Sequence, residues 1–490
     1  MKENIGRARL WTLRLITVAL ALLPFLIVEI TLRAFDWPST PPPVDPLINL
    51  HHLKPLFKLD AEQREYFVPP ERMNLFREAR FAAKKTPGTF RIFCVGGSTT
   101  QGEPYSTQTA FGAWLQIDLQ TAAGDSRKIE VINCGGLSYA SYRVLAILRE
   151  VLQYEPDLII VDVGHNEFLE KRTYDGWDQV PLNVARTRGF LQDLRMVQVA
   201  RLLIESPAAR NTPGIEHPTQ MASEVDALLD YAGGLDEYHR DDAWREPVVS
   251  HMRWNLEAMI DACSKQAVPI MLIRPVVNLL DCPPMKFETS PKLDADQRSA
   301  FEAAWSAARE SGSDAKLQRK HLEVALEIDP EHAGALFLLG RLQYAAREWD
   351  AAEQSLRRAK DADVCPLRAL TEIQDAIAET AAAHQVPLMD ADRLFQNASS
   401  QGIVGRSWLV DHIHPGVEGH QLLGNAMAEL VLQNQWVHAE VADWRNLRKA
   451  AFQAHLSSLN EDYFHRGKQR LEGLLLWTQG QAKRFLDLQP

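Results

Sequence analysis

Residues 91–101 read RIFCVGGSTTQ, an apolar run that breaks at two glycines and continues into three hydroxyl residues. The run is typical of a buried strand, and glycine permits a tight turn after it. A side chain that follows such a turn stands at the rim of a sheet, where a rigid platform holds it. Ser98 is therefore the candidate nucleophile. The competing interpretation is an ordinary strand-to-helix turn that Ser98 or Thr99 caps. If Ser98 is the nucleophile, Thr99 and Thr100 are expected to cap the helix behind it.

Further apolar runs alternate with helical patterns downstream of this stretch. We expect strands at residues 129–133, 158–163, 268–274 and 386–390, and helices at 142–152, 254–266 and 422–432. Strands separated by helices predict an α/β fold with a parallel sheet covered on both faces. Ligands of such sheets bind at the carboxyl ends of the strands. The turns at these ends carry Gly135 and Ser138 after one strand and Asn166 after the next.

The segment after the last strand, residues 407–424, reads SWLVDHIHPGVEGHQLLG and places Asp411 three residues before His414. Acyl transfer needs a nucleophile, a base, a group that orients the base and donors for the oxyanion. Ser98, His414 and Asp411 fit the first three roles. The amide of Asn166 and the backbone N–H groups of Ser98 and of Gly135 or Ser138 fit the last role.

These motifs, in this order, resemble those of the SGNH/GDSL family of hydrolases. The corresponding stretches are Gly96-Gly97-Ser98, residues 133–138 (NCGGLS), residues 164–167 (GHNE) and residues 411–414 (DHIH). The resemblance covers residues 91–430 and implies a flavodoxin-like, three-layer α/β/α fold. It also implies ester hydrolysis or acyl transfer, with Ser98, Asp411 and His414 catalytic and an oxyanion hole built from Ser98, Gly135, Ser138 and Asn166.

The chain departs from the usual family pattern at three positions. Gly97 stands where many members have Asp, and Glu167 replaces the more usual Asp after Asn166. Ser138 takes a donor position that is often Gly. A backbone N–H does not depend on its side chain, so this last change weakens the assignment of the donor rather than the site.

A metal site is the alternative use of the same region. Asp411, His412, His414 and His420 are residue types that bind divalent ions. The triad explains Asp411 and His414 better, and no second ligand cluster or P-loop is apparent in the sequence. We therefore expect neither a metal nor a cofactor. His412 is expected at the surface or behind the site, and His165 is either a pocket residue or a structural histidine.

The N-terminal segment has the composition of a membrane anchor. Residues 15–28 carry no charge, and the apolar zone spans residues 10–32 if Arg14 and Glu29 lie near its ends. A helix needs roughly 20 residues to cross a bilayer. The basic residues that precede the zone predict a cytoplasmic N-terminus and a periplasmic or extracellular catalytic domain. A cleaved signal peptide is the alternative, although no small-x-small site follows the run.

Residues 316–362 differ in kind from the rest of the chain. Ala325 and Ala359 lie 34 residues apart, and Gly340, Ala352 and Leu356 occupy small and apolar positions of a helical hairpin. This pattern resembles the tetratricopeptide repeat, whose period is 34 residues. An isolated repeat cannot bury its own apolar face. We therefore expect this insertion to pack on the main domain or to bind a protein partner.

These patterns divide the chain into six parts. They are an N-terminus with an anchor (1–35), a proline-rich linker and lead-in (36–90), the first part of the hydrolase domain (91–300), the repeat-like insertion (301–366), the last strand with the Asp/His element (367–435) and a helical extension (436–490). Two further helices, at residues 190–205 and 220–232, are expected to form a cap or side wall.

Composition narrows the choice of function. The net charge of -11 argues against a nucleic-acid partner, which usually requires a basic surface. The five cysteines show no CxxC spacing, and the sequence does not decide whether Cys263 and Cys282 form a disulfide. The expected function is a membrane-attached serine esterase or deacylase acting on an O-acyl ester, such as an O-acetyl ester, of an envelope or extracellular substrate. The alternatives are an O-acyltransferase to carbohydrate and a protein-docking scaffold with little activity.

Overall fold

The computed structural model describes residues 14, 17, 20, 21, 23–33, 35, 37, 48–50, 53–60, 62, 64–171, 194–196, 199, 219–240 and 242–477. The chain divides into two compact units, residues 1–53 with 172–223 and residues 54–171 with 224–490. The predicted proline-rich linker and most of the predicted helix at 190–205 fall outside the described residues.

The first unit has a helical segment at residues 23–33 and a parallel pair of short strands, β1 (Ile48–Asn49) and β8 (Thr219–Gln220). The carboxylate of Glu29 accepts hydrogen bonds from Arg33 Nε (2.7 Å) and from the backbone N–H groups of Arg195 and Met196 (3.0 Å each). Among the described residues, no helix is long and apolar enough to cross a membrane.

The second unit is organised around a five-stranded parallel sheet. Its strand order is β10 (Leu388–Asp390), β9 (Ile270–Arg274), β7 (Leu158–Asp162), β5 (Thr89–Gly96) and β6 (Lys128–Gly135). Renumbered along the chain, this is the 2-1-3-4-5 order of flavodoxin-like folds. Strand β5 is buried over its whole length because it lies between two strands and beneath helices on both faces, which explains its nearly continuous apolar sequence. The predicted parallel α/β fold is confirmed.

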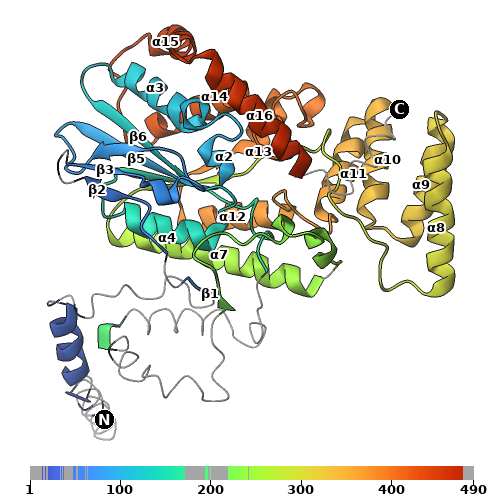
Figure 1. Cartoon of the computed structure of the whole chain (residues 1–490), viewed down its shortest axis with the longest axis horizontal. Helices are drawn as coiled ribbons and strands as arrows, with labels where there is room; N and C mark the ends of the chain where they lie inside the picture. The colour runs from blue at the N-terminus through green and yellow to red at the C-terminus, as the bar shows by residue number, and fades with distance from the viewer. Residues whose placement is uncertain are drawn as a thin grey trace, which may run out of the picture. The chain divides into compact units, whose positions relative to one another are not determined.

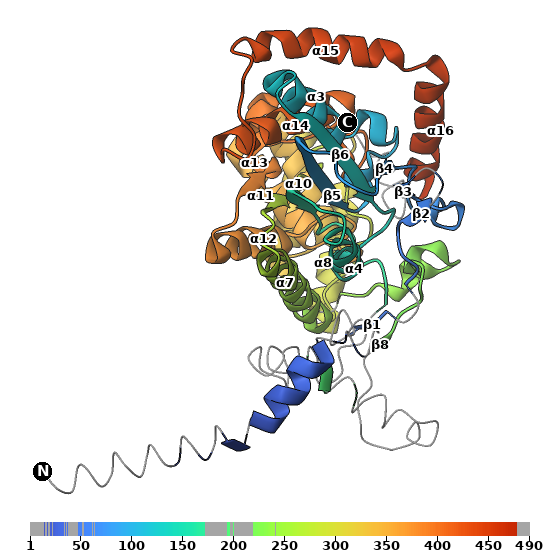
Figure 2. The ribbon, with the colours of Figure 1, turned by 90° about the vertical axis from the view of Figure 1, so that its left-hand side faces the viewer.

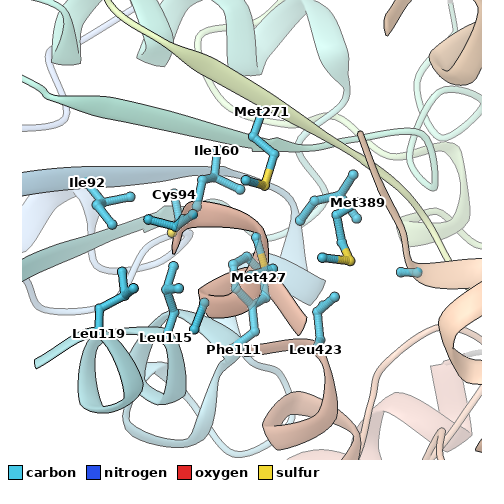
Figure 3. Packing of buried hydrophobic residues seen from close by; sticks show 14 of the residues in the cluster. Ile92, Cys94, Phe111, Leu115, Leu119, Ile160, Met271, Met389, Leu423 and Met427 are labelled. Atoms are coloured by element: carbon cyan, nitrogen blue, oxygen red, sulfur yellow. The ribbon is translucent and has the colours of Figure 1, made fainter. Parts of the chain in front are cut away.

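Helices cover both faces of the sheet (Figures 1 and 2). One layer contains α3 (Phe111–Ala123), α13 (Ala391–Ala398) and α14 (Val417–Gln433), and the other contains α4 (Ser141–Val151), α7 (Asp242–Lys265) and α12 (Thr371–His384). Figure 3 shows the core beneath the first layer, where strand residues such as Ile92 and Met271 meet Phe111 and Met427. This burial of apolar side chains fixes the sheet against its helices.

Four helices, α8 (Ala295–Glu310), α9 (Ala315–Ile328), α10 (Ala333–Ala345) and α11 (Trp349–Asp361), form the repeat-like insertion between β9 and α12 (Figure 1). A Cβ on Gly340 would lie 2.8 Å from Leu356 Cγ, so a small residue lets α10 and α11 approach closely. The insertion packs on the main domain, as expected. Arg240 Nη1 lies 2.9 Å from each oxygen of Asp329, and Arg341 Nη1 donates to the Leu280 carbonyl at 3.0 Å.

The segment before β5 forms a small antiparallel sheet of β2 (Lys58–Asp60), β3 (Glu65–Phe67) and β4 (Arg80–Ala82), with the short helix η1 (Pro70–Arg72). The predicted helix at 220–232 is wrong. The N–H groups of Asp226 and Leu228 donate to the Glu170 carboxylate and the Leu169 carbonyl, at 2.9 Å each. These bonds hold residues 226–228 beside Leu169 and Glu170. The helical part of 220–232 is limited to the short 3₁₀ turn η5 (Leu228–Asp230), and a second one, η6 (Gly234–Glu237), follows the segment.

The C-terminal extension consists of α15 (Trp444–Ser458) and α16 (Glu461–Trp477), which Figure 2 shows wrapping around the domain. Helix α15 packs on α3, where the rings of Trp114 and Phe452 lie 4.7 Å apart. Helix α16 lies against the loop after the nucleophile, residues 103–109. Tyr463 Oη is 2.8 Å from Thr109 Oγ1, and Arg470 Nη1 donates to the Tyr105 carbonyl at 3.1 Å. The extension therefore covers that loop.

All five cysteines are free thiols, so no disulfide joins Cys263 to Cys282. Cys94 and Cys134 are buried in strands, and burial raises the pKa of both thiols.

Candidate active site

The register of the sheet brings three turns to one edge. Gly96 of β5 pairs with Gly135 of β6 on one side and with Asp162 of β7 on the other. Ser98, Ser138 and Asn166, which follow these strands, therefore gather at the carboxyl edge. From β5 the chain continues to β6 on one side of the sheet and then to β7 on the other, so the strand order changes direction at β5. Parallel sheets bind their ligands at such a point.

Three side chains form one hydrogen-bonded chain at this edge. Ser98 Oγ lies 2.7 Å from His414 Nε2, and His414 Nδ1 lies 2.6 Å from Asp411 Oδ2. Ser98 is the first residue of α2 (Ser98–Gln101), directly after Gly97. The structure thus brings together the three residues that sequence spacing selected, although Ser98 and His414 lie 316 positions apart.

Backbone N–H groups of the turn from Asp411 to His414 donate hydrogen bonds to the Asp411 carboxylate. Asp411 Oδ1 accepts hydrogen bonds from the N–H groups of Ile413 (2.9 Å) and His414 (2.7 Å), which explains the three-residue spacing. Burial alone would raise the pKa of Asp411, but His414 and His412 together lower it well below its usual range. Burial alone would lower the pKa of His414, but the Asp411 carboxylate outweighs it and the net pKa is raised. Asp411 is therefore an ionised partner of the imidazole.

Asp162, at the end of β7, is a site residue that sequence analysis missed. Its Oδ2 accepts hydrogen bonds from the hydroxyls of Thr99 (2.7 Å) and Thr100 (3.0 Å). These threonines therefore tie the nucleophile turn to β7 and do not cap α2, whose N-cap residue is Gly97. Burial raises the pKa of Asp162. The available signal was an acidic residue at the end of an otherwise apolar run, LIIVD.

The Asn166 amide lies beside the nucleophile turn. Its Nδ2 donates to the Tyr139 carbonyl at 3.0 Å, which leaves its second N–H for another acceptor. A Cβ on Gly97 would lie 2.7 Å from this nitrogen. Glycine at position 97 therefore leaves room for the amide. Glu167 accepts hydrogen bonds from the N–H and hydroxyl of Ser141 (2.8 and 2.9 Å) at the start of α4.

The two backbone donors proposed for the turn after β6 differ in availability. Ser138 has a φ of 61°, a left-handed conformation that glycine adopts more easily, and its N–H has no acceptor among the described residues. The Ser98 N–H is likewise without an acceptor in the described part of the chain. The Gly135 N–H donates to Asn133 Oδ1 at 2.9 Å. Gly135 is therefore removed from the predicted oxyanion hole, because its donor is already used.

Three further histidines, His165, His412 and His420, are buried near the triad. His412 Nδ1 lies 3.5 Å from Asp411 Oδ1, so His412 sits behind the site rather than at the surface. Nδ1 of His165 accepts the Ala369 N–H at 3.2 Å, and burial lowers the His165 pKa to about 3. Nδ1 of His420 accepts the Phe111 N–H at 3.2 Å, and burial likewise lowers its pKa to about 3. Both rings are thus neutral structural groups.

Asp411, His412 and His414 form the one group of metal-ligand side chains among the described residues whose ligand atoms lie close together. His414 Nδ1 and Asp411 Oδ2 face each other at 2.6 Å, a hydrogen-bond distance with no space for an ion that needs about 2.0–2.2 Å to each ligand. His420, the fourth predicted ligand, is engaged with Phe111. The arrangement therefore fits proton transfer better than metal binding.

Comparison with known proteins gives a clear result for the insertion. A model of the tetratricopeptide-repeat family matches residues 314–365, which confirms the repeat predicted there. No curated protein matches the chain in sequence.

Part of the chain aligns with solved structures of low sequence identity. One is the lipase/acylhydrolase from Enterococcus faecalis, at 15% identity and a TM-score of 0.32, covering 72% of this chain and 100% of that chain. Another is an acetylxylan esterase from Geobacillus stearothermophilus, at 12% identity and a TM-score of 0.30, covering 72% of this chain and 97% of that chain.

Proposed function

We propose that this chain is a serine esterase that cleaves an O-acyl ester through an acyl-serine intermediate. The observation that supports it is the continuous chain of hydrogen bonds from Asp411 through His414 to Ser98, at 2.6 and 2.7 Å. A serine hydroxyl is a weak nucleophile until a base removes its proton, and a buried carboxylate keeps that base in the correct tautomer.

The proposed reaction follows from these contacts. His414 Nε2 takes the proton of Ser98 Oγ as the oxygen attacks the acyl carbon, and then gives that proton to the departing alcohol. Water, deprotonated by the same imidazole, releases the acyl group from Ser98. The N–H groups of Ser98 and Ser138 and the second N–H of Asn166 stabilise the oxyanion. Asp411 stays ionised and stabilises the imidazolium.

The proposed substrate is an O-acyl ester, such as an O-acetyl ester, of an envelope or extracellular component. It rests on the resemblance to the SGNH/GDSL family and on the apolar N-terminal segment. A second candidate, O-acyl transfer to a sugar hydroxyl, would use the same triad. Ser98, His414 and Asn166 are only 5%, 2% and 9% exposed, and this partial exclusion of bulk water at the reacting groups is compatible with transfer to a bound acceptor.

One experiment separates these candidates. The purified protein is treated with a fluorophosphonate probe and with p-nitrophenyl acetate, beside Ser98→Ala and His414→Ala. An esterase is labelled at Ser98 and releases acetate, and both variants lose turnover. Labelling with product release only after a sugar acceptor is added indicates the transferase. Wild-type protein that neither labels nor turns over contradicts both and leaves the protein-docking scaffold.

We also propose that residues 10–32 anchor the protein in the cell membrane, with the catalytic domain on the outer side. In support, the helical residues Phe25, Leu26 and Ile27 are all more than half exposed, which is unfavourable in water. Membranes washed with alkali should retain the protein, and protease added to spheroplasts should cut the 300–370 segment. Release by alkali would refute the anchor, and protection of that segment would refute the outer placement.

A further inference from the structure

Asn278 holds the turn that carries Asp411 and His414 from behind. This residue follows β9 and is 3% exposed. Its Nδ2 donates to the Asp411 carbonyl at 2.8 Å, and its backbone N–H donates to the His412 carbonyl at 3.0 Å. Two consecutive peptide groups of the catalytic turn are thus bonded to one side chain and one backbone group of the same residue.

Asn278 is held in turn by Arg368, which lies in the segment that leads from the insertion to α12. Arg368 Nη1 donates to the Asn278 carbonyl at 2.9 Å and to the Cys282 carbonyl at 2.7 Å. The arginine is 4% exposed. One nitrogen therefore fixes both ends of the loop from Asn278 to Cys282.

The other side of Arg368 faces Asp363, which lies two residues after the end of α11. Arg368 Nη2 lies 3.5 Å from Asp363 Oδ2. The Asp363 carboxylate also accepts hydrogen bonds from the N–H groups of Met285, Lys286 and Cys365, at 2.8, 3.1 and 3.1 Å. A buried carboxylate with this many donors is firmly placed, and so it gives the guanidinium a fixed counter-charge.

These contacts form a continuous path from the base of the insertion to the triad. A buried carbonyl that loses its hydrogen-bond donor destabilises the folded protein, so breaking any one of these contacts raises its free energy. The path ends on the backbone of Asp411, three residues before the base. Small displacements of a base from its nucleophile cost large factors in rate.

We propose that Arg368 is a positioning residue for the catalytic base, acting through Asn278 on the Asp411–His414 turn. This inference rests on the proposed function and deepens it. The insertion then contributes to catalysis, because the segment that joins it to α12 carries Arg368 and so influences the distance between His414 and Ser98. Arg368 touches no substrate and takes no part in proton transfer.

The test compares Arg368→Ala with Arg341→Ala. Arg341 is a matched control because it also joins the insertion to the same loop, through the Leu280 carbonyl (3.0 Å) and Asp281 Oδ1 (3.3 Å), but makes no bond to Asn278. For p-nitrophenyl acetate, Arg368→Ala should lower kcat by about tenfold or more with KM within about twofold. Arg341→Ala should leave both within about twofold.

A second readout does not require turnover. The short hydrogen bond between His414 and Asp411 places the Nδ1 proton far downfield in the proton NMR spectrum, and Arg368→Ala should shift or abolish that signal while Arg341→Ala preserves it. If wild type shows the signal but has no esterase activity and no fluorophosphonate labelling, the proposed function is refuted. The effect of Arg368 on the His414–Asp411 hydrogen bond can still be measured from the NMR signal.

Two results would overturn the proposal. One is a folded Arg368→Ala protein with wild-type kcat and an unchanged signal, and the other is an equal loss in Arg341→Ala. If Arg368→Ala does not fold, Arg368→Lys keeps the charge beside Asp363 but lacks the planar fork of donors. It should fold with a severalfold lower kcat, and wild-type kcat in that variant would equally overturn the proposal.

Discussion

Gly97→Ala tests the oxyanion assignment with one methyl group. The added Cβ would lie 2.7 Å from Asn166 Nδ2, whereas ordinary van der Waals contact begins at 3.4 Å. The amide must therefore retreat by about 0.7 Å, and its bond to the Tyr139 carbonyl must stretch or break. Loss of one oxyanion donor lowers kcat by about 100-fold, or about 2.7 kcal/mol of transition-state stabilisation. We expect that loss in kcat with little change in KM.

The assay is the hydrolysis of p-nitrophenyl acetate, with thermal unfolding measured on the same samples. Gly473→Ala is the control, because a Cβ there meets no atom within 4 Å. In an Asn166→Ala background, Gly97→Ala should lower kcat little further, since both changes remove the same donor. A folded Gly97→Ala enzyme with wild-type kcat would refute the argument, as would a full additional loss in the Asn166→Ala background.

Three further predictions follow from buried charges. Asp411→Asn should lower kcat by about 10⁴ because His414 loses the partner that fixes its tautomer; a loss below tenfold would contradict the triad. In wild type, kcat/KM should rise with pH through a His414 pKa above 6.5, since only the neutral imidazole is a base; a profile flat from about pH 5 to 8 would argue against this. Arg143→Ala, which leaves Glu170 buried without its partner at 2.6 Å, should cost about 3–5 kcal/mol in urea unfolding; a loss under about 1 kcal/mol would show that the pair is not structural.

The parallel sheet was predictable because its central strands, β5, β7 and β9, are nearly continuous apolar runs, and burial on both faces leaves that mark in sequence. The triad was predictable because Asp411 bonds its own turn, which fixes a three-residue spacing. The choice of Ser138 over Gly135 was not, since it depends on which backbone N–H is already bonded.

The hydrogen bonds of Asn278 and Arg368 behind the site could not be predicted from the sequence either. Arg368 and Asn278 act on backbone carbonyls, which every residue carries, so no partner residue type marks the contact. The segment at 220–232 has helical spacing but its helical part is limited to η5, because bonds to Leu169 and Glu170 outweigh a weak local preference. Such tertiary bonds have no local signature.

The order of the chain has a consequence for its synthesis. Ser98 is made 316 residues before His414, and α16, which bonds the loop at residues 103–109, is made later still. A growing chain on the ribosome therefore carries Ser98 long before the imidazole that lies 2.7 Å from it. Until that imidazole has been synthesised and folded into place, the Ser98 hydroxyl is an ordinary alcohol.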